Sequence, residues 1–271
     1  CSGVVTIPLQ EIQFAAAIAS QFPIDSIEKE ADIFPFNKVK LSTTTNYFSE
    51  EAAPSVSDAV VKLFKDGELA EELVEDTNEP GSYRITHDPE VGAVYHLEIE
   101  ALDNFYTTEP ETYMAVPPLL AVNAVYRENF IGDSMYYYMG IQTYEKQGEG
   151  DYYRWFFYEN NKLQTRPTLI STTNDDGLDG LCLFDFDVYG NELNLGDTLV
   201  VFQMKTSENY FNFINSVRSQ TAFVGSPFDA PPAPIVGNIK NETTGRNAQG
   251  FFHASGISAN AVVVPDTIPT L

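Results

Sequence analysis

Basic residues are scarce in this sequence. Only 15 of its 271 residues are lysine or arginine, against 39 aspartates and glutamates, which gives a net charge of −24 and an isoelectric point near 4.2. A surface this negative repels phosphate backbones and anionic lipid headgroups, so the composition argues against nucleic acid as a partner. The charge suits a soluble surface in extracellular or salty surroundings, or docking on a basic protein.

Cysteine is scarcer still, with two copies, Cys1 and Cys182. Two cysteines build neither a disulfide framework nor a metal cluster. Cys182 follows Leu181 in an apolar run and is predicted to be a small buried hydrophobe, although a Cys1–Cys182 disulfide stays open. The chain also has no run of the ~20 apolar residues that a membrane-spanning helix requires.

The residue patterns of common catalytic sites are missing as well. The three histidines, His87, His96 and His253, lie next to no cysteine and no second histidine at metal-ligand spacing. There is no Gly-x-Ser-x-Gly turn, the usual position of a hydrolase nucleophile, although a catalytic triad can be assembled from distant parts of a chain. We therefore expect structural histidines, no cofactor and no enzymatic activity.

The length and patterning of the chain predict two β-rich domains. A chain of 271 residues exceeds the usual size of one domain. The successive prolines Pro117 and Pro118 cannot donate to a strand ladder and predict a boundary near residue 117. The predicted domains are residues 1–116, which hold an N-terminal tether and a β-sandwich, and residues 117–271, an aromatic-rich β domain.

Short strands at regular spacing characterise the first predicted domain. Apolar and polar residues alternate over 36–42 and 93–102, as in half-buried strands. Asp66-Gly67 between residues 59–65 and 69–74 is a strong hairpin signal, and Pro80-Gly81 predicts a turn into residues 82–86. The pattern favours a sandwich of immunoglobulin-like or transthyretin-like type.

The second predicted domain is an antiparallel β domain with one short helix. Tyr210, Phe213, Ile214 and Val217 recur at helical spacing and predict a helix over about 207–220, with Ser207 as its cap. Strands are predicted at 135–145, 152–159, 181–188, 198–205 and 250–264.

An acidic turn spans residues 174–180. Asp175, Asp176 and Asp179 are candidate calcium ligands, because calcium takes six to eight oxygen ligands. The spacing departs from the EF-hand pattern, so an aspartate-rich turn without a metal is the favoured interpretation.

Two aromatic runs, 136–138 and 152–158, are candidates for a binding surface. Alternation along a strand sends half of each run into the core and leaves the other half outside. We predict that Tyr136, Tyr138, Tyr153 and Trp155 contact a partner, since tyrosine and tryptophan are typical interface anchors.

The first residue suggests a membrane anchor. Bacterial lipoprotein processing leaves a cysteine at the new N-terminus, where it receives two or three lipid chains that together give stable anchoring. We therefore expect lipidation of Cys1.

Several segments together resemble a known family. The clearest are Gly92–Ile99, Gly148–Trp155 and the ending from Pro227-Phe228 through Gly250–Ser255. With Cys1, they make the chain similar to the Bacteroidota outer-membrane surface lipoproteins known as domain of unknown function 4249. The segment 240–249 departs from the family pattern, because it is longer and more polar than the glycine-rich link usual there.

The resemblance implies an address and a type of partner. It implies anchoring in the outer membrane, facing the cell surface, beside a β-barrel of the TonB-dependent transporter type; it carries over no catalytic residues. Sites for Bacteroidota O-glycosylation, an Asp-Ser/Thr pair followed by an apolar residue, occur at 25–27, 133–135, 197–199 and 266–268. We expect a non-catalytic accessory subunit in uptake. A structural subunit of an outer-membrane assembly or secretion complex is the alternative, and a surface hydrolase is a further one.

Overall fold

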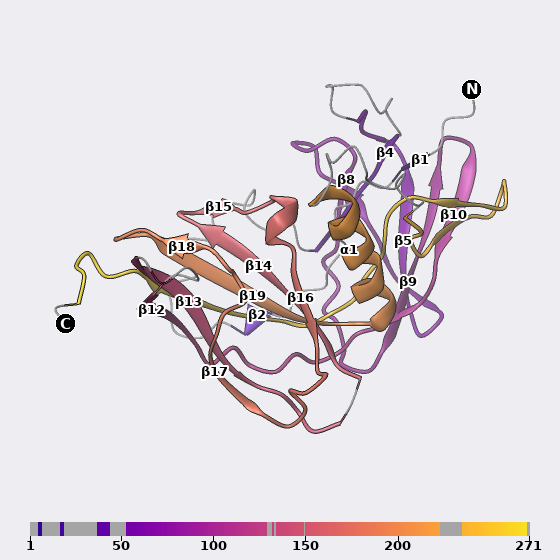
Figure 1. The fold of residues 1–271 in the computed structure, drawn as a ribbon. Coiled ribbons are helices and arrows are strands. Elements are labelled where there is room, and N and C mark those ends of the chain that lie inside the picture. The colour runs from indigo at the N-terminus through magenta and orange to yellow at the C-terminus, as the bar shows by residue number, and fades with distance from the viewer. Residues whose placement is uncertain are drawn as a thin grey trace, which may run out of the picture. The chain divides into compact units, whose positions relative to one another are not determined.

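The computed structural model describes residues 5–6, 17–18, 37–43, 53–128, 132, 134–148, 150–222 and 235–269. Within these residues the chain forms two compact units built from β-sheets (Figure 1). Unit 1 holds the described residues up to Ala115, except 17–18, together with 235–256, and unit 2 holds the rest. The structure thus differs from the prediction of one continuous second domain, because residues 235–256 belong to unit 1.

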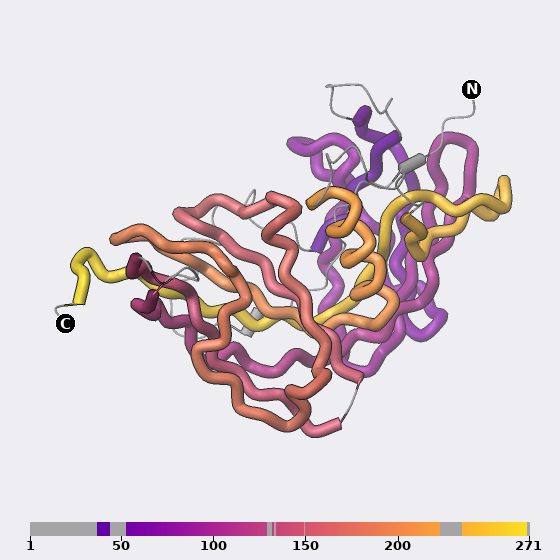
Figure 2. The backbone as a smooth tube through the Cα atoms, viewed as in Figure 1, coloured from indigo at the N-terminus to yellow at the C-terminus, as the bar shows by residue number. Residues whose placement is uncertain are grey.

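Unit 1 consists of antiparallel sheets. The larger has the strand order β21-β20-β10-β9-β5-β6, with β11 also paired to β9; the smaller has the order β3-β8-β7, and β1 pairs with β4. In Figure 2 the yellow stretch that contains β20 and β21 runs beside the magenta stretch of β10, with which β20 pairs. The strands are β1 (Val5–Thr6), β3 (Lys38–Lys40), β4 (Ser42–Thr43), β5 (Val60–Lys65), β6 (Glu68–Glu72), β7 (Val74–Glu75), β8 (Ser82–Arg84), β9 (Val94–Ala101), β10 (Asn104–Thr108), β11 (Glu111–Thr112), β20 (Ile239–Asn241) and β21 (Arg246–Ala248).

The core of unit 1 lies between these two sheets. Val39 and Tyr83 from the smaller sheet belong to one buried cluster with Leu63 and Leu97 from the larger. Because residues from both sheets share one core, unit 1 is a β-sandwich. The hairpin predicted at Asp66-Gly67 is confirmed: β5 and β6 are joined there by two residues with φ of 51° and 84°, as the favoured two-residue hairpin turn requires.

Unit 2 is also built from two sheets around one core. One has the order β12-β13-β17, with β18 also on β13; the other has the order β15-β14-β19-β22-β2, with β16 also on β14. Tyr137 and Ile141 of β13 share a buried cluster with Trp155 and Phe157 of β14. The strands are β2 (Ala17–Ile18), β12 (Ala121–Glu128), β13 (Met135–Tyr144), β14 (Tyr152–Glu159), β15 (Lys162–Leu163), β16 (Ser171–Asn174), β17 (Cys182–Phe186), β18 (Glu192–Leu193), β19 (Thr198–Thr206) and β22 (Ile257–Val263).

The helix α1 (Glu208–Thr221) packs against β14, and a short 3-10 helix, η2 (Pro167–Leu169), precedes β16. The four residues predicted to share a helix face are all buried. Ser207 caps the helix as predicted, since its Oγ accepts a hydrogen bond from the Tyr210 N–H at 3.2 Å. The ring of Phe211 lies 5.0 Å from that of Tyr152 on β14.

The predicted fold class is confirmed: the protein is mostly β, with antiparallel sheets and a single α-helix in the described part of the chain. The strand predicted over 250–264 begins later, at Ile257. Before it, the side chain of Asn238 takes the place of a strand partner, because its amide bonds both the N–H and the C=O of Phe252 at 2.8 Å. Among the described residues, no helix is long and apolar enough to cross a membrane.

Candidate functional site

Two of the four predicted partner-binding aromatics lie on the outer face of β13. Tyr137, Met139 and Ile141 of this strand are buried in the core of unit 2. The intervening side chains point the other way, so Tyr136 is 36% exposed and Tyr138 is half-buried. The position of these two tyrosines suits a contact surface, and their role stays a prediction.

The other two predicted partner-binding residues are in the core. Tyr153 is 4% exposed and Trp155 is 3% exposed, so the prediction that they contact a partner is wrong. The Trp155 Nε1–H donates to Gln203 Oε1 at 3.1 Å, and the Tyr153 hydroxyl donates to Glu145 Oε1 at 2.8 Å. Their strand, β14, has the sandwich core on one face and α1 on the other, so alternation in its sequence could not show which face is outside.

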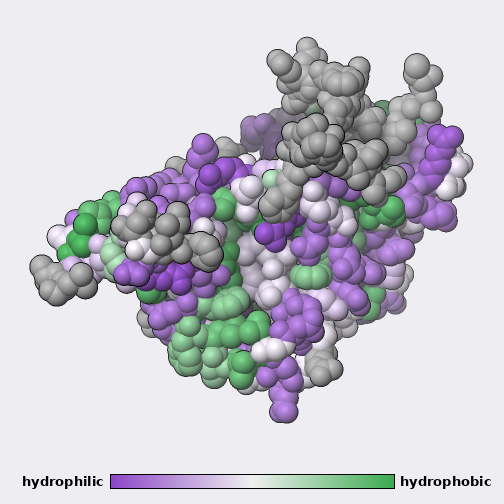
Figure 3. Space-filling view, viewed as in Figure 1, coloured by the Kyte–Doolittle hydropathy of each residue, from purple (hydrophilic) through white to green (hydrophobic). Residues whose placement is uncertain are grey.

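Further exposed apolar side chains occur on β17, just before it and at the paired end of β13. Phe184 is 71% exposed, Leu181 is 49% exposed and Tyr144 is 41% exposed. Cys182 lies opposite Tyr144 in the strand pairing and is exposed, with no disulfide partner among the described residues, so its prediction as a buried hydrophobe is wrong. In Figure 3 an apolar area covers the position of β17. We call Tyr136, Tyr138, Tyr144 and Phe184 the aromatic face.

A bulge between β13 and β17 shapes this surface. The register shifts between Ile141 and Thr143, and Asp185 adopts a positive φ of 51°. The Asp185 backbone lies directly against Gly140, where an added Cβ would be 2.7 Å from the Asp185 Cα. Glycine at this position therefore permits the bulge, and the bulge interrupts the alternation that would otherwise pair the strands residue by residue.

Charged residues border the aromatic face. The Arg127 guanidinium lies 4.5 Å from the centre of the Tyr138 ring, and its Nη2 donates to Asp187 Oδ2 at 2.7 Å. The Tyr138 hydroxyl donates to Glu192 Oε1 at 3.5 Å. Partial burial and the neighbouring Glu192 raise the pKa of Tyr138. The aromatic side chains thus lie next to ionic groups that already have partners, an arrangement typical of a contact surface with a polar rim.

The three calcium candidates are not brought together. Asp175 is buried, and its Oδ2 accepts the N–H groups of Gly150 and Asp151 at 2.8 and 3.1 Å. Asp176 accepts from Asn174, and Asp179 accepts from the N–H of Gly148 at 2.7 Å. No group of three or more metal-ligating side chains comes together among the described residues. In this turn the carboxylates of Asp175 and Asp179 accept hydrogen bonds from backbone N–H groups, and calcium binding stays a prediction.

One carboxyl group of unit 2, that of Glu145, has a raised pKa. Burial raises the pKa of Glu145 to about 7. The nearby carboxylates of Asp151 and Asp175 also raise this pKa, whereas the hydrogen bond from the Tyr153 hydroxyl lowers it. Lys205 partly offsets this local negative charge, since its Nζ lies 2.6 Å from Asp151 Oδ1. The cluster is closed within the fold rather than displayed on a surface, so we treat it as structural.

Each histidine contacts a different side chain. His253 is fully buried, with its Nδ1 3.1 Å from Glu111 Oε2. The ring of His96 stacks on Phe64 at 4.9 Å, and the ring of His87 meets Tyr95 edge-on at 5.8 Å. Each ring has a packing or hydrogen-bonding partner inside unit 1, as expected of structural histidines.

Several sequence predictions concern residues that the structure does not describe. Cys1 lies outside the described residues, and so do the glycosylation segment 25–27 and Asp133 of the segment 133–135. Of the described acceptors, Thr198 is half-buried in β19 and Thr267 is exposed. Phe184 is an exposed residue that the sequence patterns did not predict, although the neighbouring Asp185 and Asp187 interrupt the apolar run and favour exposure.

Comparison with protein families identified one match. Residues 37–260, which include parts of both units, match the family described as domain of unknown function (DUF4249). Comparison with curated proteins found no match. The match covers most of the 271 residues, so the chain belongs to the DUF4249 family.

Proposed function

We propose that this protein is a non-catalytic, surface-exposed lipoprotein of the outer membrane. In this proposal it docks on an outer-membrane β-barrel of the TonB-dependent transporter type as an accessory binding subunit in uptake, held to the membrane by lipid on Cys1. The membrane address and the barrel partner rest on the family resemblance set out from the sequence. The docking surface rests on the aromatic face of unit 2.

The exposed aromatic face is the observation that carries the proposal. Tyr136, Tyr144 and Phe184 are 36%, 41% and 71% exposed on one sheet. Exposing such side chains to water is unfavourable, at about 25 cal/mol for each Å² of apolar surface, so a partner that covers them gains free energy. Tyrosine and phenylalanine also lose little side-chain entropy when they are immobilised at an interface.

Charge sets the character of the partner surface. Arg127 is already paired with Asp187, while the exposed carboxylates of Asp185 and Glu192 accept hydrogen bonds from the neutral side chains of Asn123 and Tyr138. A partner surface that fits here is apolar and aromatic at its centre. Elsewhere the net charge of −24 favours basic loops on the partner and weakens contacts with anionic lipid headgroups.

The test is affinity purification of the tagged, full-length protein from its native outer membrane. We expect a β-barrel to co-purify with the unchanged protein and to be lost from a variant carrying Tyr136→Ser, Tyr144→Ser and Phe184→Ser. The matched control carries Val74→Ser and Val91→Ser, which remove exposed apolar side chains of unit 1. The control should retain the barrel.

Three results would contradict the proposal. The unchanged protein could purify alone, the barrel could stay bound to the aromatic-face variant, or the control could lose it equally. A co-purified barrel that inserts proteins into the membrane, instead of one that imports nutrients, would favour the alternative of a structural subunit in an assembly complex.

A further inference from the structure

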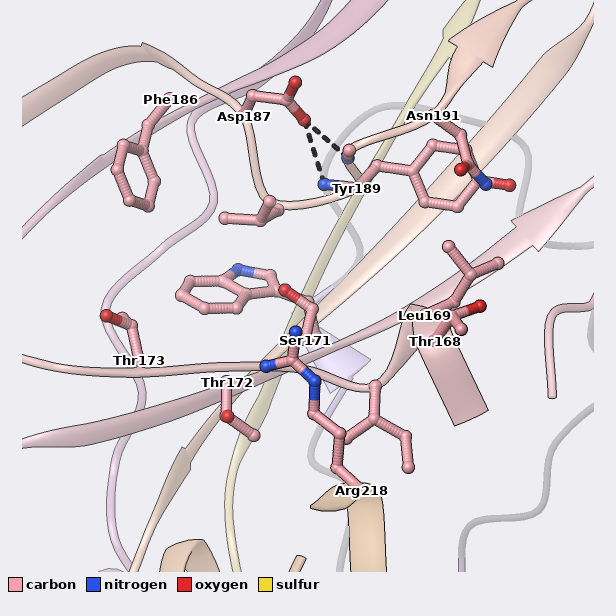
Figure 4. Close-up of a pocket in the computed structure, with 14 residues that line it drawn as sticks. Thr168, Leu169, Ser171, Thr172, Thr173, Phe186, Asp187, Tyr189, Asn191 and Arg218 are labelled. Atoms are coloured by element: carbon pink, nitrogen blue, oxygen red, sulfur yellow. Dashed lines mark hydrogen bonds between the residues drawn. The ribbon is translucent and has the colours of Figure 1, made fainter. Parts of the chain in front are cut away.

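A polar cleft opens at one edge of the unit 2 sandwich, separate from the aromatic face. It has a volume of about 330 Å³, within the range of small-molecule sites. One wall is β16 with η2, the opposite wall is the turn 186–191 between β17 and β18, and Trp155 lines the interior. Figure 4 shows the Arg218 side chain extending from α1 toward Ser171 within this cleft.

Arg218 enters the cleft without a partner from the described residues. Its Nε is buried and has no hydrogen-bond partner there, and no described carboxylate forms an ion pair with it. By contrast, Arg84 and Arg127 pair with Asp76 and Asp187 at 2.7 Å. Arg166 and Arg246 also form no ion pair among the described residues, but both are exposed to water, whereas Arg218 is half-buried. A guanidinium has five N–H donors in a planar fork that fits a carboxylate, and leaving a buried donor such as the Arg218 Nε–H without an acceptor is costly.

The one acidic residue that lines the cleft does not compete for Arg218. Asp187 Oδ2 accepts from Arg127 at 2.7 Å, while its Oδ1 accepts the N–H groups of Tyr189 and Gly190 at 3.0 and 2.8 Å. These last two bonds are the dashed lines in Figure 4, and they hold the turn that forms the wall. Because Arg127 balances the charge of Asp187, the guanidinium of Arg218 gives the cleft a local positive charge.

The remaining walls suit a ligand with several hydrogen-bonding groups and a small apolar part. Ser171 and Asn191 contribute polar groups and the half-buried Phe186 contributes aromatic surface, while the rings of Tyr189 and Trp155 are almost fully buried. Among the described strands, β16 pairs only with β14, so its other edge offers backbone groups to whatever enters. A single positive charge balances one negative charge, whereas a phosphate would bring a second negative charge into a strongly acidic protein.

We propose that this cleft binds the carboxylate group of a small organic ligand through Arg218, with the body of the ligand between β16 and the turn 186–191. Two sources supply this chemistry, a free organic acid and the C-terminal carboxylate of a short peptide, and a peptide would also pair with β16. The proposal does not depend on the docking role of the aromatic face, because the two surfaces are made of different residues.

The chain contains an intrinsic fluorescence probe for ligand binding. Trp155 is its only tryptophan and lines the cleft, so tryptophan emission, excited where tyrosine does not absorb, reports binding at this site. The experiment titrates the protein with phenylacetate and with the neutral phenylacetamide. Parallel titrations use an alanyl-alanyl-phenylalanine peptide with a free or an amidated C-terminus, and inorganic phosphate.

We expect saturable changes in emission with a free carboxylate and none with the matching amide. Binding of phenylacetate alone identifies a site for small acids, and binding of the free peptide alone identifies a site for C-termini; either supports the proposal. Arg218→Gln should weaken binding by about ten- to hundredfold, as expected for the loss of a charged hydrogen-bonding group. Arg246→Gln removes an equal charge from an exposed position of unit 1 and should change nothing.

The proposal is overturned by any of four results. Carboxylates could fail to change the emission up to about 10 mM, an affinity too weak to matter. The amides could bind as well as the acids, phosphate could bind where carboxylates do not, or Arg218→Gln could bind like the unchanged protein. If Arg218→Gln does not fold, Arg218→Lys keeps the charge and loses the planar fork, and it should still weaken carboxylate binding.

Discussion

Replacing Glu145 by glutamine should change how the stability of unit 2 depends on pH. Glu145 is 6% exposed, and its Oε1 accepts a hydrogen bond from the Tyr153 hydroxyl at 2.8 Å. Burial, supported by the charges of Asp151 and Asp175, raises its pKa from an ordinary 4.5 to about 7. Glutamine has the same shape and stays neutral, so Glu145→Gln removes the cost of ionisation and keeps an acceptor for Tyr153.

The sign and size of the effect follow from this pKa. Between about pH 4.5 and pH 7 the folded protein keeps a proton on Glu145 that the unfolded chain has released, so stability falls as pH rises through this window and then levels off. One pKa unit corresponds to about 1.4 kcal/mol, which sets a ceiling of about 3 kcal/mol. Solvent screening and the nearby Lys205 reduce this, and we expect about 1 to 2 kcal/mol.

Urea unfolding followed by Trp155 emission gives the measurement, because Trp155 lies in the core of unit 2. The variant should match the unchanged protein within about 0.5 kcal/mol at pH 5 and exceed it by about 1 to 2 kcal/mol at pH 8. Glu100→Gln, at an exposed position of unit 1, controls for the loss of one negative charge. A constant difference between the Glu145→Gln and unchanged proteins across this range would refute the reasoning.

Four further substitutions test the packing. Gly140→Ala should destabilise unit 2 by about 1 to 3 kcal/mol in the same assay, since the new Cβ would meet the Asp185 backbone at 2.7 Å. Trp155→Ala should lower the free energy of unfolding by about 3 to 5 kcal/mol, measured by circular dichroism, whereas Tyr136→Ala should change it by less than about 0.5 kcal/mol. Ser207→Ala should cost about 1 kcal/mol by removing the cap on the Tyr210 N–H, and a change below the error of urea unfolding would contradict the role of the cap.

Sequence patterns predicted the structure correctly where one face of an element is buried. In β9, Tyr95, Leu97 and Ile99 are buried while the residues between them are not, which is the alternation seen in the sequence. The helix α1 follows the same logic at a period of 3.6, and Asp66-Gly67 carries its own turn conformation. In these three cases the local pattern and the tertiary environment agree, so the sequence suffices.

The patterns failed where neighbours distant in the sequence decide the environment. The aromatic run of β14 has apolar surroundings on both faces, so its periodicity does not distinguish Trp155 from a surface residue. The bulge at Asp185 depends on Gly140, some 45 residues earlier, which leaves room for the Asp185 backbone. The return of β20 to pair with β10 likewise depends on a contact between residues about 135 positions apart, and no local signal encodes it.

The aromatic face and the arginine cleft meet at one ion pair, and this predicts that they are coupled. Arg127 lies over Tyr138 on the aromatic face and holds Asp187, which in turn holds the backbone of the cleft wall at Tyr189 and Gly190. Arg127→Gln would leave the charge of Asp187 uncompensated on that wall, so carboxylate binding measured by Trp155 emission should weaken by about three- to tenfold. Arg84→Gln breaks the comparable exposed pair with Asp76 in unit 1 and should have no effect. Equal carboxylate affinities in Arg127→Gln and the unchanged protein would mean that the charge of Asp187 does not affect binding in the cleft. The two surfaces would then act independently.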